Sequence, residues 1–397
     1  MQELIAELIH KYVEDLKSKG ALKSPAVEQA FRKVQRHRLL EAFFDFNRKT
    51  FVEVDPQNPK EEYLKMIYSD TPLVTRMVGK MPTSSTSQPS LVAMMLELLE
   101  LGPGLCVLEI GAGTGYNAAL IQEIVGEDGH VTTIDIQEDV VLQTARLLRT
   151  AGYERIEVIA ADGFYGWPKN APYDRIVATV GCPDISPHWV EQLAPGGFMI
   201  IPLQHGPEGH NPLVQIWKEG SHIRGRFANS SGFMSIQGAL SWKEGLRFQD
   251  MEEMENLPIS ERSFPAELRG WPAWSSTIRA GFGLFLSIIE NHRFVWVWTQ
   301  DCGLFERGKG ACVLTKETVL IYGNGEALYD RLVELAKMWF SLGRPGFDDW
   351  DLAFFWKGAT LPEPEENVWI LPRKFTVEVV RLKRGPGHNA YPGSEER

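Results

Sequence analysis

A glycine-rich turn directly after a short apolar strand is the feature that most limits what this chain can fold into. The strand reads Val107-Leu-Glu-Ile110, and the chain continues Gly111-Ala-Gly-Thr-Gly-Tyr116. Glycine is needed where the backbone turns sharply and a ligand approaches without a Cβ in the way. We therefore expect a nucleotide-like ligand across this turn. The dinucleotide fingerprint has its last glycine at the sixth position, where this chain has Tyr116, so the pattern argues against NAD.

Short apolar strands alternate with helices on both sides of this turn. Strands are expected at 106–110, 131–136, 156–160, 173–179 and 197–202, with helical segments between them. Buried strands of this kind, separated by helices, are typical of a parallel sheet covered on both faces. The fold class is therefore α/β with a doubly wound sheet.

An acidic residue ends each of the next two strands. Asp135 lies 20 residues after Gly115, where a carboxylate can accept hydrogen bonds from both hydroxyls of a ribose. Asp162-Gly163 follows the third strand, where contacts to an adenine are expected. The alternatives are structural: Asp135 could cap the helix that begins at Glu138, and Asp162 could simply start a turn.

Three regions are predicted along the chain: a helical N-terminal region (1–80), a ligand-binding domain (81–235) and a C-terminal α+β domain (236–397) for substrate recognition or dimerisation. Two helices are expected in the first 50 residues, the second starting at Ser24-Pro25, before a loop-rich stretch from Thr50 to Met81. Nine of the twelve tryptophans lie after residue 235, where they fill a core or line a recognition groove.

Charge and cysteine content narrow the possible partners and the compartment. The formal net charge of −11 argues against a protein that grips a nucleic-acid backbone. The four cysteines include no C-x-x-C pair, which argues against a disulfide framework or a structural zinc site and for the reducing cytoplasm. The N-terminus lacks the features of a signal peptide, and no run is long enough to span a bilayer, so no membrane partner is expected. The oligomeric state stays open.

The spacing E-x-G-x-G-x-G from Glu109 to Gly115 resembles the first motif of class I S-adenosylmethionine-dependent methyltransferases. In these enzymes the turn holds the methionine moiety and the ribose of the methyl donor. Glu109 fits beside the cationic sulfonium, although it could also be an exposed charge at a strand end. The resemblance implies a Rossmann-like methyltransferase sheet that binds S-adenosyl-L-methionine through Glu109, Gly111, Gly113, Thr114, Gly115, Tyr116, Asp135, Asp162 and Gly163.

Several further segments together resemble the protein-L-isoaspartate (D-aspartate) O-methyltransferases over about residues 25 to 235. They are Val27-Glu-Gln-Ala-Phe-Arg-Lys-Val-Gln-Arg-His37, Ser85-Thr-Ser-Gln-Pro89, Leu108-Glu-Ile-Gly-Ala-Gly-Thr-Gly-Tyr116, Tyr173-Asp-Arg-Ile176 and Gln192-Leu-Ala-Pro-Gly-Gly-Phe-Met-Ile-Ile-Pro202. The serine-rich turn followed by Gln-Pro and the Gln-Leu-x-Pro-Gly-Gly run are the segments most specific to this family.

The resemblance implies that the tripeptide Ser85-Thr86-Ser87 forms the active site, with Ser87 as the matching active-site serine. The family usually has Thr-Ile-Ser there, so the pocket of this chain is expected to be more polar. Two further departures are Thr179-Val-Gly-Cys-Pro-Asp184, where the family has an alanine-rich stretch over the substrate, and the region after residue 235, which the compact repair enzymes lack. The plain alternative for the serine-rich turn is a cap for the helix from Ser90.

The implied activity is methylation of an aspartyl or isoaspartyl carboxylate in a protein or peptide for repair. A tailoring methyltransferase acting on aspartate in a ribosomally made peptide is the alternative, and a non-catalytic ligand-binding or scaffold protein is a third reading. A carboxylate is already ionised at neutral pH, so no catalytic triad or metal site is needed. His37, within Arg36-His37-Arg38, is expected at the surface without a chemical role.

Overall fold

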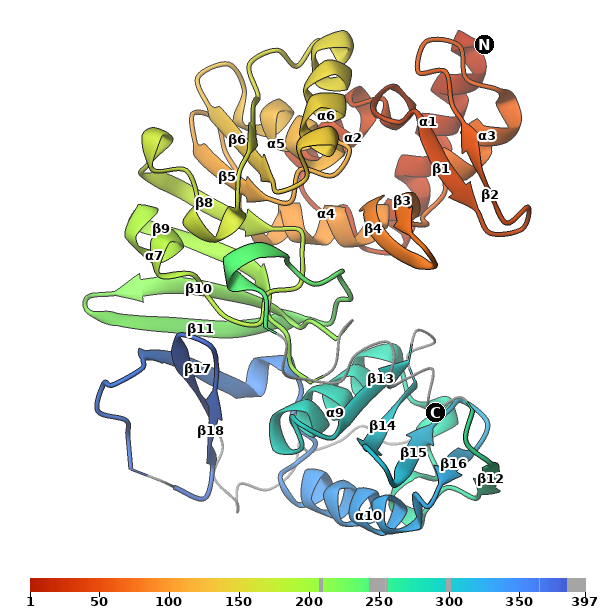
Figure 1. The fold of residues 1–397 in the computed structure, drawn as a ribbon, viewed down its shortest axis with the longest axis vertical. Coiled ribbons are helices and arrows are strands. Elements are labelled where there is room, and N and C mark those ends of the chain that lie inside the picture. Colours follow the sequence, from red (N-terminus) through yellow and green to blue (C-terminus); the bar gives the residue numbers. More distant parts are fainter. Residues whose placement is uncertain (207–209, 243–253, 255, 298–300, 364, 384–397) are drawn as a thin grey trace. The chain divides into compact units, whose positions relative to one another are not determined.

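The computed structural model describes all residues except 207–209, 243–253, 255, 298–300, 364 and 384–397. Its chain divides into two compact units (Figure 1). The first unit consists of Met1–Val180, Ser186–Ile201 and Ile236–Ala239, and the second of Gly181–Ile185, Pro202–Ser235 and Leu240–Arg397. Segments from both sides of the boundary predicted at residue 235 therefore belong to the second unit.

The N-terminal part of the first unit contains helices and two small hairpins. The helices are α1 (Gln2–Ser18), α2 (Pro25–Lys33) and α3 (Glu61–Ile67), and the hairpins are β1 (Ala42–Asp45) with β2 (Thr50–Glu53) and β3 (Leu73–Val78) with β4 (Met81–Thr86). Helix α2 begins as predicted, with the Ser24 hydroxyl accepting a hydrogen bond from the Val27 amide. The prediction of a loop-rich stretch from Thr50 to Met81 is wrong, because strands of four to six residues are too short to show their periodicity.

The rest of the first unit is an α/β layer that confirms the predicted fold class. It runs α4 (Pro89–Leu98), β5 (Cys106–Ile110), α5 (Tyr116–Val125), β6 (His130–Asp135), α6 (Glu138–Ala151), β7 (Glu157–Ala160), β8 (Tyr173–Ala178), α7 (Pro187–Gln192) and β9 (Leu193–Pro202). The strands are parallel, in the order β9-β8-β5-β6-β7, and helices α5 and α6 pack on them. The carboxyl ends of β5, β6 and β7 therefore meet at one edge, where ligands bind in sheets of this kind.

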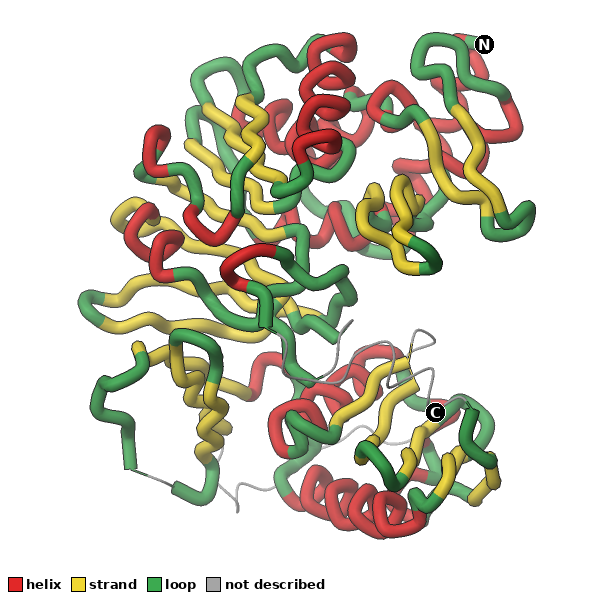
Figure 2. Tube along the Cα trace, in the orientation of Figure 1, coloured by secondary structure: helices red, strands yellow, loops and turns green. Residues whose placement is uncertain are grey.

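The second unit contains two antiparallel arrays. One has the order β18-β19-β17-β11-β10 and the other β12-β16-β15-β14-β13, with helices α9 and α10 against the latter (Figure 2). The bounds are β10 (Leu213–Glu219), β11 (His222–Asn229), β12 (Ile259–Arg262), α9 (Ser276–Ile289), β13 (Phe294–Val297), β14 (Asp301–Glu306), β15 (Gly310–Leu314), β16 (Val319–Gly323), α10 (Glu326–Ser341), β17 (Trp350–Trp356), β18 (Val368–Pro372) and β19 (Thr376–Leu382).

Three tryptophans of the second unit are part of its core. Trp271, Trp339 and Trp350 are at most 1% exposed. Trp339 packs its ring edge-on against Phe282, with centroids 5.1 Å apart. The core interpretation is confirmed for these three side chains, while Trp356 is 37% exposed and Trp298 lies outside the described residues.

Candidate functional site

The glycine turn adopts a backbone conformation that only glycine tolerates at two of its positions. Gly111 has φ 103°, and a Cβ there would lie 2.6 Å from the Thr179 hydroxyl oxygen. Gly115 has φ 79°, and its Cβ would lie 2.9 Å from side-chain carbons of Leu148 and Thr144. The glycines thus let strand β5 turn into α5 while β8 and α6 close in on the turn.

Hydrogen bonds from neighbouring elements fix this turn. The amides of Gly111 and Ala112 both donate to the Ile134 carbonyl at the end of β6, at 2.8 and 3.1 Å. The Thr179 hydroxyl donates to the Gly111 carbonyl, and the Thr144 hydroxyl donates to the Gly113 carbonyl, each at 2.6 Å. The turn is therefore held in shape from three sides before any ligand binds.

Asp135 holds its carboxylate beside the glycine turn. One of its oxygens accepts a hydrogen bond from the Gly113 amide at 3.3 Å, and the other accepts one from the Gln137 amide at 3.0 Å. The N-cap of α6 is Gln137, so Asp135 is not the cap of that helix. Each carboxylate oxygen has a second lone pair that can still accept a hydrogen bond from a ligand.

Asp162 lies at the end of the adjacent strand and starts a turn, as the structural alternative expected. It caps the short 3-10 helix Gly163–Tyr165 by accepting from the Phe164 amide at 3.0 Å, and it also accepts from the Ala239 amide at 2.7 Å. A Cβ at Gly163 would lie 2.6 Å from Ile110 Cγ2, so the chain passes close to the end of β5 there. This capping role leaves lone pairs free on both oxygens, so a ligand role remains open to Asp162.

Glu109 is fully buried and is not an exposed charge at a strand end. Its carboxylate accepts hydrogen bonds from Thr133 at 2.6 Å and from Asn117 at 2.7 Å. Burial raises the pKa of Glu109 to about 7, against the opposing effect of these two hydrogen bonds, and the nearby Asp135 charge adds to the rise. The side chain thus links β5 to α5 and β6 directly behind the turn.

The segment Ser85-Thr86-Ser87 reaches the glycine turn. The sequence predicts a serine-rich turn for this segment, but most of it belongs to a strand. Ser85 and Thr86 are the last residues of strand β4, and a Cβ on Gly113 would lie 3.2 Å from the Ser85 carbonyl oxygen. Helix α4 has Gln88 as its N-cap without a side-chain cap, so the capping alternative is wrong. Among the described residues, none forms a hydrogen bond with the half-buried Ser87 hydroxyl.

Arg36 and His37 are the functional candidates that the sequence reasoning missed. Arg36 is 1% exposed, and its guanidinium donates to the carbonyls of Ile67 at 2.8 Å and Ser87 at 3.0 Å. His37 is 3% exposed, and its Nδ1 lies 2.7 Å from the Tyr68 hydroxyl, so the prediction of a surface histidine is wrong. A run of three basic residues has the composition expected of a solvent-exposed surface. Only the family resemblance of the segment from Val27 to His37 indicated that these residues belong to a functional site.

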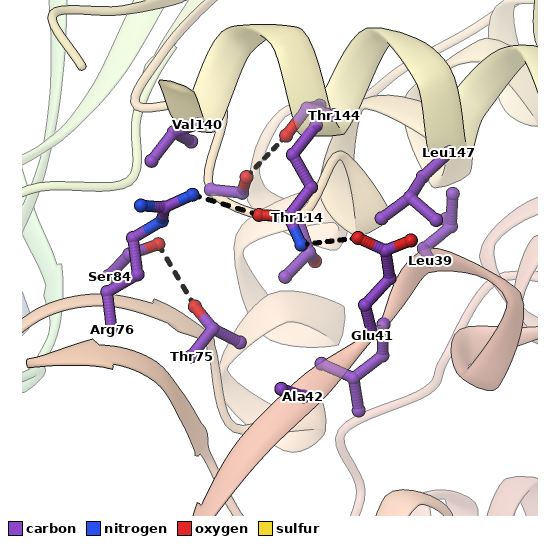
Figure 3. Close-up of a pocket in the computed structure, with 13 residues that line it drawn as sticks. Leu39, Glu41, Ala42, Thr75, Arg76, Ser84, Thr114, Val140, Thr144 and Leu147 are labelled. Atoms are coloured by element: carbon purple, nitrogen blue, oxygen red, sulfur yellow. Dashed lines mark hydrogen bonds between the residues drawn. The ribbon is translucent and has the colours of Figure 1, made fainter. Parts of the chain in front are cut away.

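A small hollow opens beside the glycine turn (Figure 3). The Ser84 and Thr75 hydroxyls are hydrogen-bonded at 3.1 Å on one side of it, and Arg76 and Glu41 contribute charged groups. Its lining residues are Leu39, Leu40, Glu41, Ala42, Thr75, Arg76, Ser84, Gly113, Thr114, Val140, Gln143, Thr144 and Leu147. Of the predicted site residues, Gly113 and Thr114 therefore border this hollow.

The polar groups at this edge fit a cationic nucleoside ligand. Register pairing places Ile110 beside Ile134 and Asp135 beside Ala160, so the glycine turn, Asp135 and Asp162 occupy successive strand ends. Carboxylates at two strand ends suit a ribose diol and an amino-bearing base, and they favour a ligand that carries positive charge. No group of three or more potential metal ligands occurs among the described residues.

This doubly wound sheet, with its glycine turn after the first strand and acids after the next two, defines a class I S-adenosylmethionine-dependent methyltransferase. The family model of protein-L-isoaspartate (D-aspartate) O-methyltransferase matches residues 7–239. That match covers more than half of the chain, and the chain belongs to this family. It is therefore an enzyme that uses S-adenosyl-L-methionine to methylate oxygen.

Relatives and one solved structure agree with this assignment. The chain is 37% identical over 242 residues to protein-L-isoaspartate O-methyltransferase of Pyrococcus horikoshii, covering 60% of this chain and 98% of the relative. It is 35% identical over 239 residues to the enzyme of the same name from Methanopyrus kandleri, covering 59% and 93%. A solved protein-L-isoaspartate O-methyltransferase has a similar fold, with a TM-score of 0.53 and 24% identity.

That solved structure also bears on the region after residue 235. The likeness covers 87% of this chain and 96% of the other, so it extends beyond the end of the family match. The fold of the C-terminal region is therefore not peculiar to this chain. Within the described residues, no helix is long and apolar enough to cross a membrane.

Replacing Asp135 by alanine tests its assignment to the methyl donor. The substitution removes a charged acceptor for two ribose hydroxyls, each hydrogen bond being worth about 1.5 kcal/mol, so affinity for S-adenosylhomocysteine should fall by about 100-fold. Isothermal titration calorimetry measures this loss. The matched control is Asp139→Ala, which removes an exposed acid that pairs with Arg76. Unchanged affinity in Asp135→Ala would show that Asp135 only stabilises the glycine turn.

Proposed function

We propose that this enzyme repairs damaged polypeptides by methylating the α-carboxylate of isoaspartyl residues. The observation that carries the proposal is the Ser87 hydroxyl, which is unused by the described residues and follows a strand whose Ser85 carbonyl lies against Gly113 of the donor turn. Family membership supports the same substrate class. Nothing in the comparisons supports the tailoring alternative.

The donor would be held by the glycine turn and the two strand-end acids. Asp135 would accept from the ribose hydroxyls and Asp162 from the adenine, while Gly111, Gly113, Thr114, Gly115 and Tyr116 would line the amino-acid and ribose portion. Glu109 and Gly163 support the turn and the strand end from within the fold. When bound, S-adenosyl-L-methionine supplies an electrophilic methyl group with a neutral thioether as its leaving group.

The reaction needs orientation and the exclusion of water more than it needs a base. A carboxylate oxygen attacks the methyl carbon, the sulfur–methyl bond breaks, and the sulfur keeps the electron pair. The acceptor is ionised at neutral pH, so no proton has to be removed. Ser87, with Thr86 and Ser85, would hold one carboxylate oxygen and leave the other free to attack. The resulting ester can close to a succinimide with loss of methanol, and hydrolysis then restores part of the aspartate.

Paired peptides test the substrate. The purified chain and labelled S-adenosyl-L-methionine are incubated with two peptides that differ only in an isoaspartyl or an aspartyl linkage. Methylation confined to the isoaspartyl peptide is expected. Equal or preferential methylation of the aspartyl peptide would contradict the repair function and favour the tailoring reaction. The cytoplasm is the proposed compartment, in keeping with four cysteines that are all free thiols.

The variant Ser87→Ala tests the acceptor site separately from the donor site. Its turnover should fall by about 10- to 100-fold, because one positioning hydrogen bond to the carboxylate is lost, while affinity for S-adenosylhomocysteine stays within about twofold. Steady-state kinetics and calorimetry measure the two effects. Ser90→Ala, at the start of α4, is the matched control in the same segment. Full turnover in a folded Ser87→Ala enzyme would move the chemistry to another residue.

A further inference from the structure

Arg36 is a buried cation whose contacts are all with neutral groups. It is 1% exposed, and its Nη1 and Nη2 atoms donate to backbone carbonyls and one hydroxyl, while its buried Nε has no hydrogen-bond partner among the described residues. The acceptors are Ile67 O at 2.8 Å, Ser87 O at 3.0 Å, Thr71 O at 3.2 Å, Ser69 O and Thr86 O at 3.4 Å, and Thr86 Oγ1 at 3.5 Å. In the described part of the chain, no carboxylate lies within 4 Å of this guanidinium to form an ion pair.

The acid nearest in sequence to these carbonyls is already engaged elsewhere. Asp70 pairs with Lys19 at 3.0 Å and accepts from the Ser90 amide at 2.8 Å. On its other side, Arg36 faces the ring of Tyr116, whose centroid is 5.7 Å from the guanidinium carbon. Carbonyl dipoles and an aromatic face solvate the cation but leave its net charge of +1 unneutralised. Buried charges in proteins are normally paired, so a full countercharge is missing here.

The uncompensated charge lies directly behind the segment assigned to the acceptor. The same Nη2 atom contacts both Thr86 and Ser87, so the guanidinium lies against the backbone of both residues. We propose that Arg36 is a positioning residue whose charge completes the acceptor site: it holds the Thr86–Ser87 backbone and favours an ionised carboxylate at Ser87. This inference rests on the proposed function.

The charge balance of the reaction gives Arg36 a distinct kinetic signature. Methyl transfer converts an anionic carboxylate and a cationic sulfonium into a neutral ester and a neutral thioether. A fixed positive charge therefore stabilises the bound substrate more than the transition state, and it does not retain the neutral product. At roughly 9 Å from a carboxylate held by the Ser87 hydroxyl, and with an effective dielectric constant of about 20, one charge changes affinity for an anion by on the order of 10-fold. Loss of the charge should raise KM at least about 10-fold and leave kcat within about threefold.

The decisive experiment compares a carboxylate with a neutral analogue. A short isoaspartyl peptide and the same peptide with a carboxamide in place of the α-carboxylate are titrated against the full-length enzyme in the presence of S-adenosylhomocysteine. The wild-type enzyme should prefer the carboxylate by at least about 10-fold. Arg36→Gln should reduce this preference to about threefold or less, and Arg36→Lys should retain most of it. If Arg36 had a purely structural role, Arg36→Gln would weaken the binding of both peptides equally. An unchanged ratio of carboxylate to carboxamide affinity in Arg36→Gln would therefore overturn the inference.

A surface variant covers the case in which Arg36→Gln does not fold, as judged by loss of S-adenosylhomocysteine binding. The Thr71 side chain is exposed while its carbonyl accepts from Arg36, so Thr71→Asp adds a countercharge nearby and Thr71→Asn is its neutral control. The carboxylate preference should fall at least threefold in Thr71→Asp relative to Thr71→Asn, and equal preferences would again overturn the inference. If the wild-type enzyme does not bind isoaspartyl peptides, the proposed function is contradicted. An aspartyl peptide and its carboxamide analogue then test Arg36 through the same ratio of affinities.

Discussion

A chain that ends at residue 235 is expected to be insoluble or unfolded and to lose all measurable affinity for the methyl donor. Every residue assigned to the methyl donor precedes residue 235. From the sequence alone, we would therefore expect the truncated chain to keep its affinity for the donor. In the second unit, however, strand β11 pairs with β17, with Ile223 opposite Phe354 and Gly225 opposite Leu352. Truncation would expose the hydrogen-bonding edge of β11 and the apolar residues that β17 covers.

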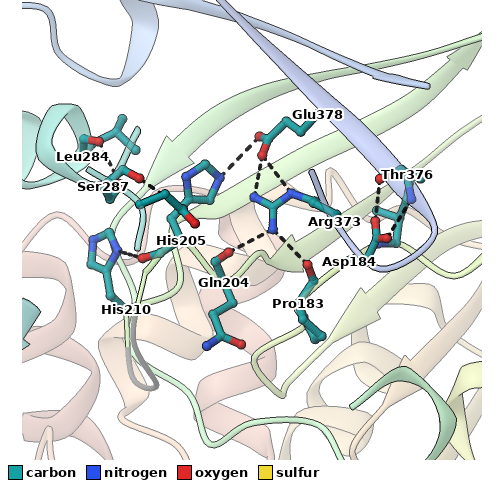
Figure 4. A network of polar contacts seen from close by, with 12 residues as sticks. Pro183, Asp184, Gln204, His205, His210, Leu284, Ser287, Arg373, Thr376 and Glu378 are labelled. Atoms are coloured by element: carbon teal, nitrogen blue, oxygen red, sulfur yellow. Dashed lines mark hydrogen bonds and ion pairs between the residues drawn. The ribbon is translucent and has the colours of Figure 1, made fainter. Parts of the chain in front are cut away.

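The truncation would also remove the interaction partners of buried charged residues (Figure 4). Asp184 is fully buried and accepts hydrogen bonds from the Thr376 hydroxyl at 2.6 Å and the Thr376 amide at 2.9 Å. Arg373 donates to the Pro183 carbonyl at 2.8 Å and pairs with Glu378, whose carboxylate lies 3.3 Å from His205. Removing Phe375 and Thr376 would take these hydrogen-bond donors away from the Asp184 carboxylate, which lies in the segment that directly continues the chain after Thr179 and Val180.

Soluble yield, circular dichroism and S-adenosylhomocysteine binding measure the outcome of truncation. The control is a chain ending at Lys383, which keeps every described residue and should behave like the full-length enzyme. A soluble chain ending at 235 with normal donor affinity would contradict this expectation. That result would favour the hypothesis that residues 236–397 are a separate domain for substrate recognition.

The free energy of unfolding should fall steeply as the pH drops from about 6.5 toward 4. Burial lowers the pKa of His37 to about 4, with a further effect of Arg38, and it lowers the pKa of His210 to about 3. Burial also lowers the pKa of His205, although Glu378 opposes the shift. These side chains are neutral in the folded state and take up protons on unfolding near pH 6.5, so their contribution is complete above that pH and is lost below it.

Glu109 acts in the opposite direction over the same range. Its pKa of about 7 exceeds the unfolded value near 4.3, so between these values the folded state holds a proton that the unfolded state releases. On unfolding, His37 and His210 each gain a proton and Glu109 loses one, which leaves a net uptake of about one proton, or about 1.4 kcal/mol per pH unit, and the lowered pKa of His205 acts in the same direction. Burial alone would raise the pKa of Glu378, but chiefly the Arg373 charge lowers it to about 2, so this group adds to acid lability only below about pH 4.5.

Urea unfolding at pH values between 4.5 and 7.5, followed by tryptophan fluorescence, measures this slope. His37→Asn keeps a polar group toward Tyr68 but cannot titrate, so it should reduce the slope by about 1.4 kcal/mol per pH unit. His222→Gln, at an exposed position, should leave the slope unchanged. A free energy of unfolding independent of pH in this range would contradict the neutral, buried state of the histidines.

The structural features of this enzyme that could be predicted from sequence are those whose residues lie close together along the chain. The strand before Gly111, the turn itself and Asp135 one βα unit later belong to a local repeat of strand and helix. Hydrophobic periodicity and the conformational needs of glycine act within such short segments, so they indicated the fold class and the donor side of the site. The short hairpins β1–β2 and β3–β4 were missed because four to six residues carry too little periodicity.

The acceptor side depends on contacts that no local pattern encodes. Arg36 reaches Ser87 across 51 positions, and Asp184 reaches Thr376 across 192. Charged side chains usually face water, so the sequence predicted a surface position for His37, whereas packing of the N-terminal segments buried both His37 and Arg36. Sequence patterns alone therefore sufficed for the class I methyltransferase sheet and for the glycine turn after its first strand. Only the tertiary structure decided that the buried Arg36 contacts the Ser87 carbonyl and which C-terminal strands hold the segment after β8, because burial and long-range pairing arise only when distant segments pack together.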